Sequence, residues 1–338
     1  MRFGVYSAIL HDRPLVEALG VLKGLGLQGL EINSGGFLPP VHIPILDEIL
    51  KSDTARDDFL GLFEESGVSI AGLNCNGNPL HPNPAIGHKH AADVIRSIHL
   101  ARRLGQDRVV TMSGLPGGEP GATIPNWMVN AWNSASIGVI KYQFGIAAKF
   151  WGEVDMIARD MDVKIALELH PQNLVFNVPT IRELVESAKA TNIGVELDAS
   201  HLFWQQMDPI AVVRELGPLV YQAAAKDVLV NSKNAELVGV LDNSFRVLDP
   251  AEDRVNLGGD EWVNEWPQKS AWDFVAVGKG HGADYWARFI SACEAVDPGM
   301  WLNIEHEDTS MGRIEGLEYA ANTLKTSANL AGVSWNSN

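Results

Sequence analysis

Two short apolar segments in the middle of the chain each end in side chains that can bind metals or move protons. The segment Ile-Ala-Leu-Glu-Leu-His ends in Glu168 and His170, and the segment Val-Glu-Leu-Asp-Ala-Ser-His ends in Asp198 and His201. Carboxylates and imidazoles are ligands for divalent cations and can act as general acids and bases. These four residues are therefore the first candidates for a catalytic site.

The stretch between the two segments indicates how they come together. Residues 178–188 place apolar side chains at helical spacing and carry a proline in the first turn, which is typical of a helix start. Two buried strands joined by such a helix form a βαβ unit, in which both strands are parallel and end at one edge of the sheet. We therefore expect Glu168 and Asp198 to lie side by side at that edge.

The same alternation of strand-like and helix-like segments extends over the whole chain. Strands are expected at residues 2–7, 30–33, 68–73, 108–112, 165–170, 195–201, 220–226 and 300–305. Helices are expected at residues 15–25, 55–66, 91–104, 142–161, 178–188, 208–216, 283–296 and 314–324.

Such a series of strand–helix units without a linker predicts one α/β domain over residues 1–338, folded as a closed (β/α)8 TIM barrel. Long loops are expected after strands 4 and 7. An open doubly wound sheet is the alternative, but residues 6–9 after the first strand lack the glycine motif that binds phosphates there.

Charge and composition exclude several classes of partner. The formal net charge of −16 argues against nucleic acid and anionic membrane surfaces, because both require a basic face. The chain shows no signal peptide and no apolar run of about 18 residues, so no membrane span is expected. Its two cysteines, Cys75 and Cys293, are too few for a disulfide framework. We therefore expect a cytoplasmic protein with free thiols.

In a (β/α)8 barrel the active site lies at the carboxyl ends of the strands. The expected strand ends carry these polar residues: Glu31, Asn74 to Asn78, Ser113, Glu168, His170, Asp198, His201, Lys226, Asp227, Glu305, His306 and Glu307. Several carboxylates at one edge would repel one another and raise one another's pKa, and a cation would relieve that repulsion. The ring therefore predicts one divalent ion such as Mn²⁺, Mg²⁺ or Zn²⁺.

The main candidates also have purely structural interpretations. Glu168 could be a strand-end carboxylate that pairs with Lys226. Asp198 could cap a turn or helix, and the imidazoles of His170 and His201 could be hydrogen-bonded packing residues.

Five motifs carry a resemblance to a known family. They are Glu168-Leu169-His170-Pro171, Leu197-Asp198-Ala199-Ser200-His201-Leu202-Phe203-Trp204, Ala225-Lys226-Asp227, Val277-Gly278-Lys279-Gly280-His281 and Asn303-Ile304-Glu305-His306-Glu307-Asp308. With these motifs the chain resembles the xylose isomerase-like TIM barrels, the sugar phosphate isomerases and epimerases. Within that group it is most similar to the larger (alpha) subunit of bacterial C-glycoside deglycosidases, which act on 3-keto-glycosides with a small β-rich partner subunit.

The resemblance implies a metal site. It implies that Glu168, Asp198 and Glu305 hold one divalent ion, expected to be Mn²⁺, with Mg²⁺, Co²⁺ and Zn²⁺ as alternatives. The family's fourth ligand is a histidine on strand seven, but this chain has Ala224 at that position. His201 is expected either to replace that ligand or to contact the substrate.

The resemblance also implies the chemistry, which is removal of a proton from the carbon next to a sugar carbonyl. Glu168 and Glu305 are the expected acid–base pair, with His170 and His201 as alternatives for the base. The residues expected to contact substrate are Asn74, Trp204, Lys226 and His281. The absence of an Arg or Lys cluster at the strand ends favours a neutral sugar or a 3-keto-glycoside over a phosphorylated sugar.

Three outcomes remain open from the sequence. Return of the proton would make the protein a sugar isomerase or epimerase. Expulsion of a leaving group would make it a lyase, the catalytic subunit of a C-glycoside deglycosidase with a small β-rich partner. Because Ala224 removes a metal ligand, a metal-free sugar-binding or scaffolding subunit is the third possibility. In each case we expect an oligomer.

Overall fold

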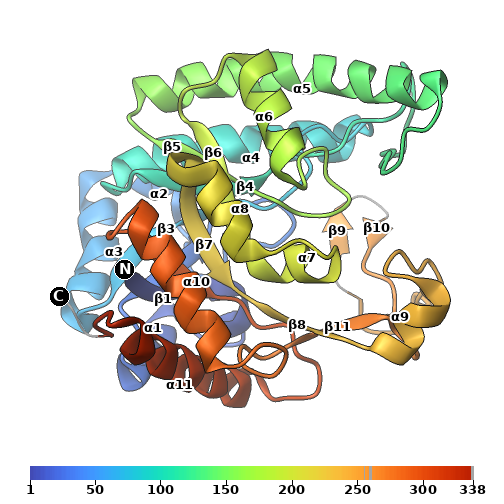
Figure 1. The fold of residues 1–338 in the computed structure, drawn as a ribbon. Helices are drawn as coiled ribbons and strands as arrows, with labels where there is room; N and C mark the ends of the chain where they lie inside the picture. The colour runs from blue at the N-terminus through green and yellow to red at the C-terminus, as the bar shows by residue number, and fades with distance from the viewer. Residues whose placement is uncertain (255, 259–260, 336–338) are drawn as a thin grey trace.

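Eight parallel strands close into a barrel at the centre of the molecule (Figure 1). The computed structural model describes residues 1–254, 256–258 and 261–335. The strand order around the barrel is β1-β12-β7-β6-β5-β4-β3-β2, and every neighbouring pair is parallel. The predicted closed (β/α)8 barrel is therefore confirmed, and the open doubly wound sheet is excluded.

The barrel strands are short and almost entirely buried, as their apolar composition predicts. Their bounds are β1 Arg2–Tyr6, β2 Gly29–Asn33, β3 Ser69–Asn74, β4 Arg108–Met112, β5 Lys164–Glu168, β6 Ile193–Asp198, β7 Val220–Ala225 and β12 Trp301–Ile304. Each expected strand corresponds to one of these, with differences of a few residues at the ends.

A ring of helices covers the outside of the barrel (Figure 1). The principal helices are α1 Leu15–Leu25, α3 Asp53–Ser66, α4 Pro84–Arg103, α5 Ser134–Asp160, α6 Val178–Ala188, α8 Pro209–Leu216, α10 Ala283–Val296 and α11 Arg313–Ala331. The shorter ones are the 3₁₀ turns η1 Ser7–Leu10 and η2 Gly217–Leu219 with the helices α2 Leu46–Ile49 and α7 Ala199–Trp204. Helix α5 begins earlier than predicted because Asn133 caps it, accepting a hydrogen bond from the Ser136 backbone N–H.

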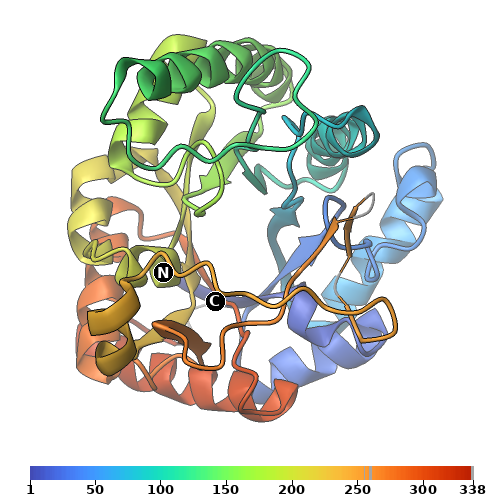
Figure 2. The same cartoon turned by 90° about the vertical axis from the view of Figure 1, so that its right-hand side faces the viewer.

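The longest excursion from the barrel lies between β7 and α10, over residues 226–282. It contains β8 Asp227–Val230, α9 Ser232–Val238, β9 Asn256–Gly258, β10 Glu261–Trp262 and β11 Trp272–Val275, with β8 antiparallel to β11 and β9 antiparallel to β10. Figure 2 looks into the end of the barrel where this excursion and the 113–133 loop after β4 lie. The excursion reaches across to the loop after β3, because His81 Nε2 lies 3.1 Å from Glu261 Oε1.

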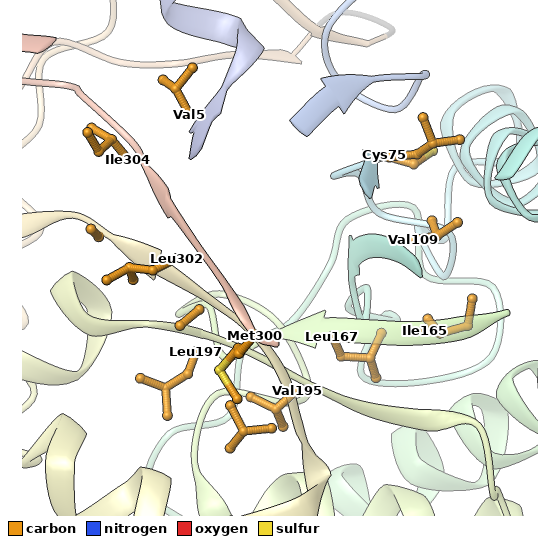
Figure 3. Close-up of a cluster of buried hydrophobic side chains, with 14 of the residues drawn as sticks. Val5, Cys75, Val109, Ile165, Leu167, Val195, Leu197, Met300, Leu302 and Ile304 are labelled. Carbon is orange, nitrogen blue, oxygen red and sulfur yellow. The ribbon is translucent and has the colours of Figure 1, made fainter. Parts of the chain in front are cut away.

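The two faces of the barrel strands bury different chemistry. On β5 and β6, alternate residues Ile165, Leu167, Val195 and Leu197 belong to the large apolar core between barrel and helices (Figure 3). The intervening residues face the barrel interior and include the carboxylates at the strand ends. Both cysteines are buried and unpaired. No helix in the described part of the chain is long and apolar enough to span a membrane.

Candidate metal and acid–base site

Glu168 and Asp198 come together at the carboxyl end of the barrel, as their positions at neighbouring strand ends predict. They are the last residues of β5 and β6. His201 lies between them, with its Nε2 3.2 Å from Glu168 Oε1 and 3.3 Å from Asp198 Oδ2. All three side chains are buried.

Asp198 positions His201 through the short helix α7. Its Oδ1 accepts a 2.7 Å hydrogen bond from the Ser200 backbone N–H and so caps the helix. One helical turn then carries His201, three residues on, back over Asp198. The other oxygen, Oδ2, accepts no hydrogen bond from any described residue. The capping role and a ligand role are therefore compatible, because they use different oxygens.

Lys226 links the remaining carboxylates of the cluster. It follows β7, and its Nζ lies 2.7 Å from Glu307 Oε1, 3.5 Å from Glu305 Oε2 and 3.9 Å from Asp198 Oδ2. Its ammonium also lies 4.3 Å above the Phe274 ring of β11. The Lys226 ammonium thus lies near both Asp198 and Glu305.

His201 also belongs to a compact group of side chains that could bind a metal ion. One ligand atom from each of Glu168, His170 and His201 falls within 4.8 Å of the others, and the two imidazole rings are 4.1 Å apart between centroids. This set differs from the expected one, because it contains His170 and includes neither Asp198 nor Glu305.

The donor set fits a divalent ion. Ligands at the usual bond length from a tetrahedral zinc are roughly 3.3 Å apart, which is close to the spacing of His201 Nε2 from both Glu168 and Asp198. Burial, followed by the nearby His170, lowers the pKa of His201 to about 3, so its imidazole is neutral and able to bind a metal.

The environment separates the pKa values of the carboxylates. Burial would raise the pKa of Glu168, but the hydrogen bond with His201 and the charges of His170 and Lys226 lower it to about 2. Burial raises the pKa of Asp198 to about 7 against the opposing charge of Lys226. Burial likewise raises the pKa of Glu305 well above its ordinary value, again opposed by Lys226. Glu168 therefore holds a proton less tightly than Glu305 does.

Three of the four expected substrate contacts have structural partners. Asn74 donates a 2.7 Å hydrogen bond to Glu31 Oε1 inside the barrel. Trp204 stacks on Trp272 of β11 at 4.6 Å. His281 Nδ1 lies 2.7 Å from Asp227 Oδ1. The Trp204–Trp272 stack and the stacking of His281 on Phe203 pack the excursion against α7, whereas Lys226 lies within the cluster.

Asn76 contacts the cluster directly, although the sequence marks it only as one of several asparagines after β3. Its Nδ2 donates a 2.6 Å hydrogen bond to Glu168 Oε2. Asn74 and Asn76 are two residues apart, and Asn74 Oδ1 accepts a hydrogen bond from the Asn76 backbone N–H. The first of the pair therefore positions the second.

A buried polar layer beneath the cluster was not expected. Glu31 Oε2 accepts hydrogen bonds from Gln222 at 2.6 Å and Asn303 at 2.7 Å, in addition to the one from Asn74 at Oε1. Glu196 lies in the same interior, and neither of its oxygens has a hydrogen-bond partner among the described residues. Burial raises the pKa of Glu196 well above its ordinary value.

Comparison of the chain with known families agrees with this architecture. Residues 19–327 match the family described as xylose isomerase-like TIM barrel. The chain belongs to the xylose isomerase-like TIM barrel family. It is also 31% identical over 329 residues to the uncharacterized protein YfiH of Bacillus subtilis (strain 168), covering 96% of this chain and 98% of YfiH.

Three solved structures share the fold of this chain. The probable 3-DHS dehydratase AsbF of Bacillus anthracis matches with a TM-score of 0.63 and 14% identity, over 96% of this chain and 99% of AsbF. The IolI protein with a bound zinc atom matches with a TM-score of 0.58 and 18% identity, over 98% of each chain. The 3-keto-D-glucoside 4-epimerase YcjR of E. coli, in its apo form, matches with a TM-score of 0.60 and 10% identity, over 97% of this chain and 99% of YcjR.

Proposed function

We propose that this protein is a divalent-metal-dependent carbohydrate enzyme. It removes a proton from the carbon next to the carbonyl of a neutral sugar or 3-keto-glycoside and returns it, as an isomerase or epimerase does. The observation that carries the proposal is the buried cluster at the mouth of one barrel, in which His201 Nε2 lies 3.2 Å from Glu168 Oε1 and Lys226 Nζ lies 3.5 Å from Glu305 Oε2, with the pKa of Glu168 lowered and that of Glu305 raised. Carboxylates whose environments separate their pKa values in this way serve as base and acid.

The roles of the residues follow from their contacts. Glu168 accepts the proton, held in place by the hydrogen bond from Asn76, with His201 Nε2 3.2 Å from its Oε1. Glu305, whose pKa is raised and whose Oε2 lies 3.5 Å from the Lys226 ammonium, delivers a proton from the other side of the cluster. Lys226 stabilises the negative charge that develops on the carbonyl oxygen of the substrate.

The metal site of the proposal comprises Glu168, His170 and His201, with the unpartnered Oδ2 of Asp198 beside them. An ion bound there would polarise the sugar carbonyl and make the neighbouring C–H bond more acidic. The zinc atom in IolI supports a metal in this fold, and the 3-keto-D-glucoside activity of YcjR supports a keto-sugar substrate.

Solvent isotope exchange tests the proposal. We expect the purified protein with Zn²⁺ or Mn²⁺ to move deuterium from D₂O into the carbon next to the carbonyl of a ketose or 3-keto-glucoside, followed by NMR. A chelator should stop the exchange. Glu168→Gln should slow it by at least about a hundredfold, since it removes the general base, whereas the exposed Glu183→Gln on α6 should not. Full exchange in chelated, metal-free protein would contradict metal dependence and leave a metal-free enzyme.

A lyase is the second candidate function. AsbF is a probable dehydratase, and loss of water next to a carbonyl is an elimination that begins with the same proton removal. Deuterium uptake into a ketose without product, together with release of the leaving group from a 3-keto-glycoside, would favour the lyase. The relation to C-glycoside deglycosidase alpha subunits, the small β-rich partner and the oligomeric state stay predictions, and the metal-free binding subunit would show neither exchange nor metal uptake.

A further inference from the structure

Phe274 of β11 contacts two residues of the cluster, Lys226 and His201. The Lys226 ammonium lies over the face of the Phe274 ring, 4.3 Å from its centroid, and the His201 imidazole meets the same ring edge to face, with centroids 5.6 Å apart. An aromatic face attracts a cation, and the attraction is stronger where water is excluded. The Lys226 side chain is only 5% exposed, so this contact is made under the favourable condition.

The backbone fixes Phe274 beside Lys226. Strand β8 begins at Asp227, directly after Lys226, and β11 pairs with it in antiparallel fashion. In this register Phe274 lies opposite Val228, and Val275 lies opposite Asp227. The ring and the ammonium group therefore belong to one two-stranded ribbon, although the two residues are far apart in the sequence.

This ribbon packs on the short helix α7 through aromatic rings (Figure 1). Trp272 and Phe274 are two residues apart on β11 and so point to the same side. Trp272 stacks on Trp204 at 4.6 Å, and Phe274 meets His201, which lies three residues before Trp204 on the same helix. Two ring contacts thus fix the position of Phe274 relative to His201.

The carboxylates around the Lys226 ammonium differ in their exposure to water. Glu307 Oε1 is the nearest, at 2.7 Å, and the Glu307 side chain is 54% exposed. Glu305 Oε2 at 3.5 Å and Asp198 Oδ2 at 3.9 Å belong to side chains that are 7% and 0% exposed. A lysine side chain is flexible and its ammonium is strongly hydrated. Without a further restraint, Lys226 would therefore turn toward Glu307 and solvent.

We propose that Phe274 is a positioning residue for the acid–base site, whose ring keeps the Lys226 ammonium beside Asp198 and Glu305 and shields it from water. The 226–282 excursion then completes the site, because it supplies this ring. The inference rests on the proposed function, in which Lys226 stabilises the charge that develops on the substrate carbonyl, and it adds a residue that acts through Lys226.

Chemical labelling of Lys226 tests the contact without any turnover. The full-length protein is treated with a limiting amount of acetic anhydride, and peptide mass spectrometry compares acetylation of Lys226 with that of the exposed Lys233. Phe274→Leu should raise the relative labelling rate of Lys226 by about five- to thirtyfold, the factor expected for loss of a shielded cation–π contact. Phe274→Tyr keeps an aromatic ring and should label like the wild type.

Phe245→Leu is the matched control in the same excursion. The Phe245 ring contacts Trp266 edge to face at 4.8 Å, and in the described part of the chain it is Phe274 that lies against Lys226. This control should leave Lys226 labelling unchanged. Phe274→Met, with a flexible apolar side chain, is tested in parallel in case Phe274→Leu does not fold.

Two labelling results would overturn the positioning role. One is an unchanged labelling rate in the folded variants that lack the Phe274 ring. The other is an equal rise in Phe245→Leu, which would mean that loss of any ring loosens the excursion as a whole.

Kinetics separate positioning from packing. We expect Phe274→Leu to lower kcat for deuterium exchange into 3-keto-glucose by about tenfold and to leave KM within about twofold, because the Lys226 charge acts on the transition state. Phe274→Tyr and Phe245→Leu should exchange like the wild type. Faster labelling with unchanged kcat would overturn the positioning role and leave the proposed function intact. A wild-type protein that exchanges no keto-sugar proton would overturn the proposed function instead, and the role of Phe274 with it.

Discussion

Lys226 is a buried ammonium group whose position depends on carboxylates from two segments of the chain, the end of β6 and the residues after β12. Its side chain is 5% exposed, and the side chains of Asp198 and Glu305 beside it are 0% and 7% exposed. Buried ions of one sign are costly without their counterion, so the ionised state of Lys226 depends on the carboxylates around it. Burial lowers the pKa of Lys226, but the neighbouring carboxylates, led by Glu307, raise it well above its ordinary value.

We therefore expect Lys226→Met to destabilise the protein by about 3 kcal/mol or more at neutral pH, because it leaves the carboxylates that surround Lys226, the buried Asp198 among them, without their cation. Urea unfolding followed by circular dichroism measures this. The exposed Lys233→Met on α9 is the control and should change stability by less than about 0.5 kcal/mol. A Lys226→Met protein as stable as the wild type would show that the carboxylates are protonated or otherwise neutralised.

The two oxygens of Asp198 can be separated by a single substitution. In Asp198→Asn the side-chain oxygen can still accept from the Ser200 backbone N–H, so we expect the helix cap and stability to be largely kept. Loss of the negative charge should weaken Zn²⁺ or Mn²⁺ binding by at least about tenfold, measured by titration calorimetry.

Asp208→Asn is the matched control for Asp198→Asn. Asp208 caps α8 in the same way, accepting from the Ile210 backbone N–H at 3.0 Å, and it does not belong to the cluster. Equal metal affinity in wild type, Asp198→Asn and Asp208→Asn would remove Asp198 from the site.

At the residue scale, the sequence predicted which side chains lie at the same edge of the barrel, but it did not predict their hydrogen-bond partners. Glu168, Asp198 and Lys226 could be placed together because strand ends in a barrel share one edge. The partner of Asn74 could not be predicted, because Glu31 lies 43 positions away and the pleat of β3 decides which asparagine faces inward. His281 and Asp227 lie at opposite ends of the 226–282 excursion and are 54 positions apart. No local sequence pattern predicts a contact over that separation.

At the scale of elements, the packing of α11 against the end of β12 determines the position of the His306 side chain. His306 is buried, and neither of its ring nitrogens finds a partner among the residues described. Gly316 of α11 allows this close approach, since a Cβ there would lie 1.9 Å from His306 Cε1.

Gly316→Ala should therefore displace His306, lower stability by about 1–3 kcal/mol and reduce activity, because His306 is covalently joined to Glu305. Gly24→Ala in α1 is the opposite case, because a Cβ at that site meets nothing within 4 Å. It should raise stability by about 0.5–1 kcal/mol through reduced backbone freedom in the unfolded chain. Thermal and urea unfolding of the two variants measure both effects, and a neutral Gly316→Ala would contradict the contact.

The elements themselves were predictable to different degrees. The bounds of α1, α6 and α10 follow from apolar periodicity with clear starts and stops, and the structure places them where expected. The short helix α7 was missed, because a helix of a single turn or two carries too little periodicity and because Asp198 and His201 were interpreted as strand-end residues. The antiparallel pair of β8 and β11 was missed too, since neither strand alternates between buried and exposed residues.

At the scale of the whole molecule, the closed barrel was predictable because its signal is repeated along the chain. Each strand is an apolar run followed by a helix, so an error in one unit does not change the topology. The polar layer inside the barrel was not predictable in the same way. It is formed by single residues from β2, β3, β7 and β12, namely Glu31, Asn74, Gln222 and Asn303, and only closure brings these strands together.

This interior layer makes the stability of the barrel depend on pH through Glu31. Burial raises the pKa of Glu31 from 4.5 to about 7, against the three amide hydrogen bonds that favour its ionised form. The folded state therefore holds the proton more tightly than the unfolded chain does. The stabilisation from this group is complete below about pH 4.5 and is lost as the pH rises through about 7.

Each pKa unit corresponds to about 1.4 kcal/mol, so the loss attributable to Glu31 between pH 4.5 and 8 is about 3 kcal/mol. We expect Glu31→Gln to remove this component, because a glutamine at that position cannot ionise. Urea unfolding at several pH values should give a smaller decline with pH for Glu31→Gln than for the wild type or for Glu48→Gln, an exposed residue of α2. Parallel pH profiles for all three proteins would mean that Glu31 keeps an ordinary pKa inside the barrel, its charge held by the amides of Asn74, Gln222 and Asn303.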